Sequence, residues 1–152
     1  MLTPPRLRAF RVRLSEAPGR GPARIAYPSR MGAEQDHPIT IEPNPNRVRV
    51  VFNSRIVADT TRALTLREAG YRPVLYVPRN DADPSMLERT DHRTHCRYKG
   101  DAAYFTIRVD GQAATNAVWT YESPLPGVAA IKDHLAFYPS RVERIEELPA
   151  NP

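Results

Sequence analysis

The chain has 152 residues, a formal net charge of +5 and ordinary fractions of charged and apolar residues, which indicates one soluble globular domain. No run approaches the roughly 18 apolar residues of a membrane span, and the N-terminus lacks the apolar core of a signal peptide, so we expect a cytoplasmic protein. The single cysteine excludes an internal disulfide and a zinc site built from paired cysteines.

Residues 1–45 contain half of the 16 prolines and few apolar side chains, so we expect a largely irregular, flexible arm rich in proline and arginine. Within it, Phe10, Val12 and Leu14 alternate with arginines, a pattern that fits either a half-buried strand or a sticky tail segment. The arginines form no stripe with interleaved aromatic residues, so we favour a solvated basic surface over a nucleic-acid-binding one.

A single, mainly β domain is expected over residues 46–146, with a short tail over 147–152. Apolar residues alternate over 47–58 around a turn at Asn53-Ser54, which predicts a β-hairpin. Two further strands are expected over 64–68 and 74–77, the second ended by Pro78.

Helices are expected to be few and short. Asp83 before Pro84 is typical of a helix start, with a turn or two over 85–88. A weak helix is expected over 128–134, and a strand over 135–138. These patterns predict small antiparallel sheets in a tent-like or sandwich-like arrangement, with one or two short helices.

Asp110-Gly111 predicts a two-residue hairpin turn between strands over 103–109 and 112–121. A regular ladder from this turn would pair Ala102 with Trp119 and Tyr104 with Ala117. Trp119 and Tyr104 would then share one face of the sheet as diagonal neighbours.

The stretch from Thr94 to Tyr104 contains the only cysteine and one of the two lysines. Cations next to Cys96 would lower its thiol pKa and favour a reactive thiolate, but a free cysteine is also a common buried packing residue. Lys99 could bind a carboxylate or phosphate, or it could be a solvated residue at a strand end. Both pairs of alternatives stay open.

The aromatic face of Tyr104, Trp119 and Tyr121 could form the wall of a pocket for a small molecule, or a second core face. Glu68 and Tyr76 are secondary candidates for the same site. Because Lys99 lies near a strand end, we expect Lys99→Met to keep the fold and abolish binding of an anion. No metal site, cofactor, phosphate-binding glycine loop or Gly-x-Ser-x-Gly motif is expected.

The chain resembles the bacterial family of domain of unknown function 427, which also has a nucleotidyltransferase-like label. One departure is Arg97, where the family usually has proline. The resemblance implies a small, mostly β domain and supports the choice of site residues, but it implies no reaction. It rests on the spacings Cys-x-x-Lys-Gly and Trp-x-Tyr-x-x-Pro and on these residues: His37-Pro38-Ile39, Val50, Ala58-Asp59-Thr60, Glu68, Tyr76-Val77-Pro78, Thr94-His95-Cys96, Lys99-Gly100, Tyr104, Trp119-Thr120-Tyr121, Pro124, Ile131 and Phe137-Tyr138.

The leading hypothesis is therefore a pocket for an unknown anionic small molecule, with or without catalysis. Cys96 and Lys99 are the candidate catalytic residues, and the Tyr/Trp face is the candidate ligand contact. The alternatives are a protein-interaction module, such as a homodimer, and then nucleic-acid binding through the basic arm. A concave site around Lys99 would favour the leading hypothesis, and a flat exposed aromatic face would favour the protein-interaction module.

Overall fold

The computed structural model describes residues 37–150. The possible strand at Phe10, Val12 and Leu14 and most of the expected arm lie outside these described residues. Over residues 37–150 the chain forms ten β-strands and four short 3-10 helices, with no α-helix. The expectation of a mainly β fold is confirmed.

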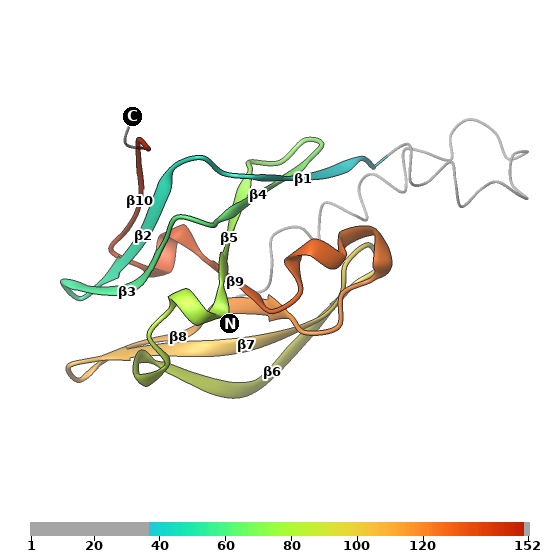
Figure 1. Ribbon diagram of the computed structural model, residues 1–152. Helices are drawn as coiled ribbons and strands as arrows, with labels where there is room; N and C mark the ends of the chain where they lie inside the picture. The colour runs from blue at the N-terminus through green and yellow to red at the C-terminus, as the bar shows by residue number, and fades with distance from the viewer. Residues whose placement is uncertain (1–36, 151–152) are drawn as a thin grey trace, which may run out of the picture.

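Two antiparallel sheets make up the described part of the chain (Figure 1). The three-stranded sheet has the order β10 (Arg144–Leu148), β2 (Arg47–Phe52) and β3 (Arg55–Thr60). The seven-stranded sheet has the order β1 (Ile39–Pro43), β4 (Leu64–Glu68), β5 (Val74–Pro78), β9 (His134–Phe137), β8 (Gln112–Tyr121), β7 (Gly100–Val109) and β6 (Leu87–Cys96).

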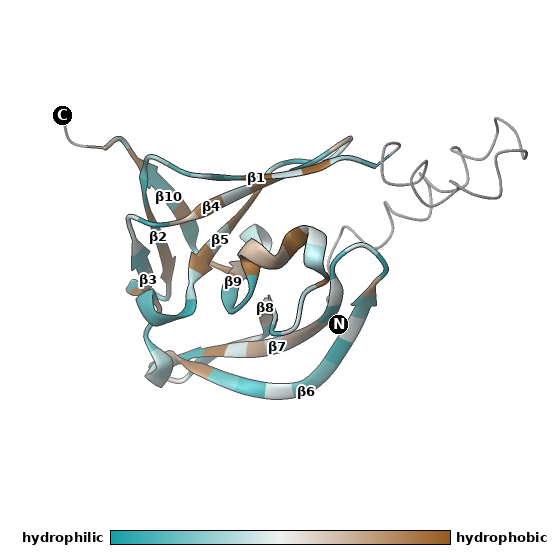
Figure 2. Ribbon diagram, turned by 45° about the vertical axis from the view of Figure 1, so that its right-hand side comes forward, coloured by the Kyte–Doolittle hydropathy of each residue, from teal (hydrophilic) through white to brown (hydrophobic). Residues whose placement is uncertain are grey.

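The seven-stranded sheet is strongly curved, so that β1 and β4 lie across from β6, β7 and β8 (Figure 2). The 3-10 helix η5 (Pro126–Ile131) lies inside this curve and contacts β1. The three-stranded sheet flanks the opposite face. Strand alternation therefore sends neighbouring residues into two different cores.

The inner core, inside the curve, is aromatic and contains Tyr76, Tyr104, Trp119 and Tyr121 together with Cys96. The outer core is aliphatic and lies on the other face. Its members from both sheets include Val48, Val50, Val77, Phe105, Ile107, Val118, Leu135 and Phe137.

The hairpin of β7 and β8 has the expected turn but not the expected register. Asp110 and Gly111 have φ of 47° and 83°, as a two-residue turn requires. A bulge then shifts the register between Phe105 and Ile107, so that Tyr104 pairs with Trp119 and Ala102 with Tyr121. The predicted pairing of Ala102 with Trp119 is wrong, whereas the shared face of Tyr104 and Trp119 is confirmed.

The bulge has an identifiable cause at Asn116. Its backbone has φ of 51°, and its N–H donates to the Thr106 hydroxyl oxygen at 3.1 Å instead of to the ladder. Such local side-chain to backbone bonds compete with regular pairing.

Several element boundaries also differ from the expectation. The β structure starts at Ile39, within the expected arm, and β10 continues to Leu148. The polar run that precedes Cys96 belongs to β6, an edge strand. The expected helices are 3-10 turns, η4 (Pro84–Met86) and η5, although Asp83 does cap η4 by accepting from the Ser85 N–H.

Candidate functional site

The Cys-x-x-Lys-Gly stretch forms the tight connection from β6 to β7. The Lys99 N–H donates to the Cys96 carbonyl at 3.2 Å, and the Lys99 carbonyl accepts from the Leu125 N–H at 2.9 Å. Gly100 has φ of +113°, a conformation that residues with a Cβ avoid. The turn therefore directs the Lys99 side chain inward.

Lys99 ends in a buried cluster of three ionisable side chains. Its Nζ donates to Glu68 Oε1 at 3.0 Å, and the other oxygen of Glu68 is hydrogen-bonded to His37 Nε2 at 2.6 Å. The Lys99 side chain has no solvent exposure, and those of His37 and Glu68 are 1% exposed. Tyr98 stacks on the His37 ring with 4.4 Å between centroids and thereby covers the cluster.

Cys96 lies beside this cluster, in the aromatic core. Burial raises the pKa of the Cys96 thiol above its ordinary value, and the nearby charge of Lys99 lowers it by less. At neutral pH the thiol is therefore protonated, which supports the packing role among the two interpretations of Cys96. The neighbouring Arg97, which departs from the family pattern, is exposed and lies over the Tyr98 ring.

The aromatic residues expected to contact a ligand do lie together. Trp119 Nε1 donates to the Tyr76 hydroxyl at 3.3 Å, and the Tyr104 and Thr94 hydroxyls share a hydrogen bond of 2.9 Å. Tyr76, Tyr104, Trp119 and Tyr121 are all buried. The structure thus joins the expected ligand residues and Cys96 in one core, with the Lys99–Glu68 pair beside it.

A cleft of about 920 Å³ opens elsewhere, between the two sheets. Its origin is a split between β5 and β9, which pair only at Val77–Leu135 and Pro78–His134. Beyond these pairs the strands diverge and leave space between them. Both strands, the turn before β5 and the strands β2 and β10 supply the lining, which includes Val48, Arg72, Val74, Leu75, Phe137, Tyr138, Arg144, Ile145 and Glu147.

Trp119 connects the cleft with the aromatic core. It belongs to the inner core but also lines the cleft, next to Tyr138, whose ring centroid is 4.5 Å from its own. Of the seven expected site residues, Trp119 is the one that lines this cleft. Lys99, Cys96, Glu68, Tyr76, Tyr104 and Tyr121 do not, and their proposed roles stay predictions.

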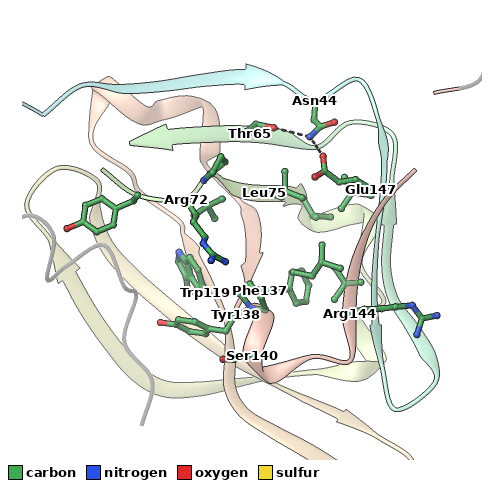
Figure 3. A pocket seen from close by; sticks show the side chains of 18 of the residues that line it. Asn44, Thr65, Arg72, Leu75, Trp119, Phe137, Tyr138, Ser140, Arg144 and Glu147 are labelled. Carbon is green, nitrogen blue, oxygen red and sulfur yellow. Dashed lines mark hydrogen bonds between the residues drawn. The ribbon is translucent and has the colours of Figure 1, made fainter. Parts of the chain in front are cut away.

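Arg72 is a cation that points into the cleft, on the side of Trp119 and Tyr138 (Figure 3). Among residues 37–150, it has no hydrogen-bond or ion-pair partner. Arg144 also lines the cleft, but its guanidinium points away and binds Glu146 at 2.7 Å and Glu143 at 2.8 Å. Arg67 lines the cleft as well and has no such partner among the described residues, so the cleft offers two uncommitted guanidinium groups, and that of Arg72 lies beside an aromatic wall.

Sequence reasoning missed Arg72, Tyr138 and the His37 contact to Glu68. Tyr138 and His37 were among the residues that carried the family resemblance, so a signal for them existed. Arg72 stands in a turn between Gly70 and Pro73, and no local pattern distinguishes it from the other arginines.

Within the described residues, no group of three or more His, Cys, Asp or Glu side chains is arranged to hold a metal ion. No helix in the same part of the chain is long and apolar enough to cross a membrane.

Comparison with known proteins identifies a family. A family model described as a domain of unknown function, DUF427 (NTP_transf_9), matches residues 40–148, and the matched range contains all ten strands except the first residue of β1. No curated protein matches the chain. Because the match spans well over half of the sequence and the strands of both sheets, the chain belongs to the DUF427 family.

Proposed function

We propose that the protein binds a small anionic molecule in the cleft between its two sheets. The observation that carries the proposal is the Arg72 guanidinium, which has no partner among residues 37–150 and points into the cleft beside Trp119 and Tyr138. Most other arginines among residues 37–150, such as Arg47 and Arg89, instead form ion pairs with carboxylates.

The size and lining of the cleft suit a small ligand. Ligand sites typically enclose about 300–1,000 Å³, and this cleft has about 920 Å³. Its walls are mainly apolar, with Val74, Leu75 and Phe137 on either side of the split between β5 and β9. A planar ligand could stack against this wall while the guanidinium binds a carboxylate or phosphate through two parallel N–H donors.

Lys99 is less suitable as the anion-binding residue that the sequence suggested. An anion approaching its ammonium group would meet the Glu68 carboxylate 3.0 Å away, and the ammonium has no contact with solvent. We propose that the Lys99–Glu68 pair, together with the aromatic core, instead holds Trp119 in place as part of the cleft wall. Catalytic roles for Cys96 and Lys99 are not required for this function.

Two observations make the alternatives less suitable. The aromatic face is buried, and within residues 37–150 the large hydrophobic residues that are exposed are the well-separated Ile56 and Leu125. A protein-interaction surface would need a contiguous apolar patch. Many arginines among residues 37–150 also form ion pairs with carboxylates, which neutralise their charge. These side chains are less suitable for binding the phosphates of a nucleic acid.

Trp119 is the single tryptophan of the chain, so its fluorescence reports directly on the cleft. We expect benzoate and phenyl phosphate to change this fluorescence saturably, and the neutral analogues benzamide and phenol to do so far more weakly. Arg72→Gln should lower the affinity for both anions about tenfold, because one charge-assisted contact is lost. Arg144→Gln is the matched control and should bind as the wild type does, since that guanidinium faces away from the cleft.

Equal responses to the charged and neutral probes would contradict the proposal. So would an Arg72→Gln variant that binds both anions with wild-type affinity. Circular dichroism and a thermal midpoint for each variant would show that the fold is retained.

A further inference from the structure

The cleft also contains an uncommitted negative charge, the carboxylate of Glu147 on β10. This side chain is exposed and lines the cleft, and one of its oxygens accepts from Asn44 Nδ2 at 2.9 Å. Within residues 37–150 it has no ion pair with any arginine, lysine or histidine. By contrast, its neighbour Glu146 is bound to Arg144.

Asn44 fixes the position of this carboxylate. Asn44 is buried, and its Nδ2 donates to the Thr65 hydroxyl oxygen at 3.0 Å as well as to Glu147. Its Oδ1 accepts from the Asn46 N–H at 2.7 Å. Because both amide atoms are committed to the protein, the Asn44 side chain acts as a rigid support and leaves the second Glu147 oxygen for another donor.

Arg72 and Glu147 lie on different sides of the cleft, with Leu75 between them (Figure 3). They do not pair with each other, since no ion pair joins them. Two opposite charges that are held apart across an apolar wall are complementary to a molecule with the reverse arrangement. Such a molecule has an acidic group at one end, an apolar middle and a cationic donor at the other end.

We infer that the ligand of the cleft is amphoteric: a small aromatic or cyclic acid that also carries a protonated amine. This inference rests on the proposed function, because the Arg72 end of the site is the anion site proposed above. Arg72 binds the carboxylate or phosphate, the ring lies against the apolar wall beside Trp119, and Glu147 accepts from the ammonium group. Glu147 thus determines specificity for the second end of the ligand.

Three matched probes separate the two ends of the site: benzoate, benzylamine and 4-(aminomethyl)benzoate. Titrations followed by Trp119 fluorescence and by calorimetry should show 4-(aminomethyl)benzoate binding about five- to tenfold more tightly than benzoate, the gain of one further charge-assisted hydrogen bond. Glu147→Gln should abolish this advantage, so that this variant binds 4-(aminomethyl)benzoate no more tightly than benzoate. Glu146→Gln is the matched control and should keep the advantage, because Glu146 does not line the cleft.

The outcomes distinguish this inference from the proposed function. If benzoate binds through Arg72 but the added amine brings no gain, or if Glu147→Gln retains the gain, the inference fails while the proposed function stands. If neither acid binds at all, the proposed function fails and the inference fails with it. An advantage that is lost in Glu147→Gln and kept in Glu146→Gln supports both.

Discussion

Lys99 shows how a residue that resembles a ligand contact in sequence can become part of the interior. The alternation of a strand would leave a lysine at a strand end in solvent, but the Gly100 conformation turns it inward to Glu68. The pair is buried together with His37, which contacts the other oxygen of Glu68, and the two charges stabilise each other in the interior. Burial therefore reverses the expectation that Lys99 can be replaced without effect on the fold.

We predict that Lys99→Met lowers the free energy of unfolding by about 3–5 kcal/mol, because the Glu68 carboxylate is left buried without its cation. Adding Glu68→Gln to this variant should restore part of the loss, since it removes the orphaned charge. Urea denaturation at pH 7 measures both effects.

Lys132→Met is the natural control, because Lys132 is the other lysine of the chain and its ion pair with Asp133 is exposed. It should change stability by less than about 0.5 kcal/mol. A Lys99→Met variant as stable as Lys132→Met would mean that the buried pair contributes nothing to the fold.

At the scale of the element, two glycines define the two ends of β7. Gly100 begins the strand with φ of +113°, and Gly111 follows it in the hairpin turn with φ of +83°. A Cβ at Gly100 would lie 3.3 Å from the Ser123 carbonyl oxygen, whereas one at Gly111 would meet nothing within 4 Å. The two positions thus share backbone strain but differ in available space.

We predict that Gly111→Ala costs about 1 kcal/mol and Gly100→Ala about 2–3 kcal/mol of unfolding free energy. The difference arises from displacement of the backbone around Ser123, which lies against the turn that holds Lys99. Denaturation midpoints of the two variants test this directly. Equal costs at both positions would show that strain alone, without the steric contact, determines the effect.

The strands that could be predicted are those whose pattern is local. Asp110-Gly111 and the alternation of Phe105, Ile107 and Val109 are sufficient for the hairpin. β6 gave no such signal, because an edge strand with its side chains largely toward solvent contains mostly polar residues. The register also could not be read, because the bulge depends on a hydrogen bond between Thr106 and Asn116, ten positions apart.

The aromatic part of the candidate site was predictable for the same reason, since Tyr104 and Trp119 lie on one face of one hairpin. The cleft was not. It exists because β5 and β9, which are more than fifty residues apart in the chain, pair briefly and then separate. Arg72 and Glu147 line a common cleft only because these strands separate, so no local sequence pattern could identify them as site residues.

At the scale of the whole molecule, surface ion pairs connect elements that are distant in the chain. Glu122, just after β8, binds Arg89 of β6 at 2.7 and 2.8 Å and Arg79 of the 3-10 helix η3 (Arg79–Asp81) at 3.3 Å. The hydrogen bond from Arg89 is the largest cause that lowers the pKa of Glu122, from 4.5 to about 2. Folding therefore favours the ionised form of this carboxyl group.

This shift predicts how stability depends on pH. Because the pKa is lower in the folded state, the stabilisation is fully present above about pH 4.5 and is lost as pH falls toward about 2. The Glu122 side chain is 34% exposed, so solvent screening limits the contribution to about 1 kcal/mol or less. Glu122→Gln should be less stable than the wild type at pH 7, and the difference should shrink between pH 4.5 and pH 2.5.

Urea denaturation of the wild type and Glu122→Gln across this pH range measures the effect, with Glu42→Gln at an exposed position of β1 as the control for loss of a carboxylate. Glu42→Gln should follow the wild type throughout. A stability difference for Glu122→Gln that stays constant from pH 7 to pH 2.5 would show that the side chain acts through packing. A difference that disappears on acidification would assign it to the charge that joins β6, η3 and the end of β8.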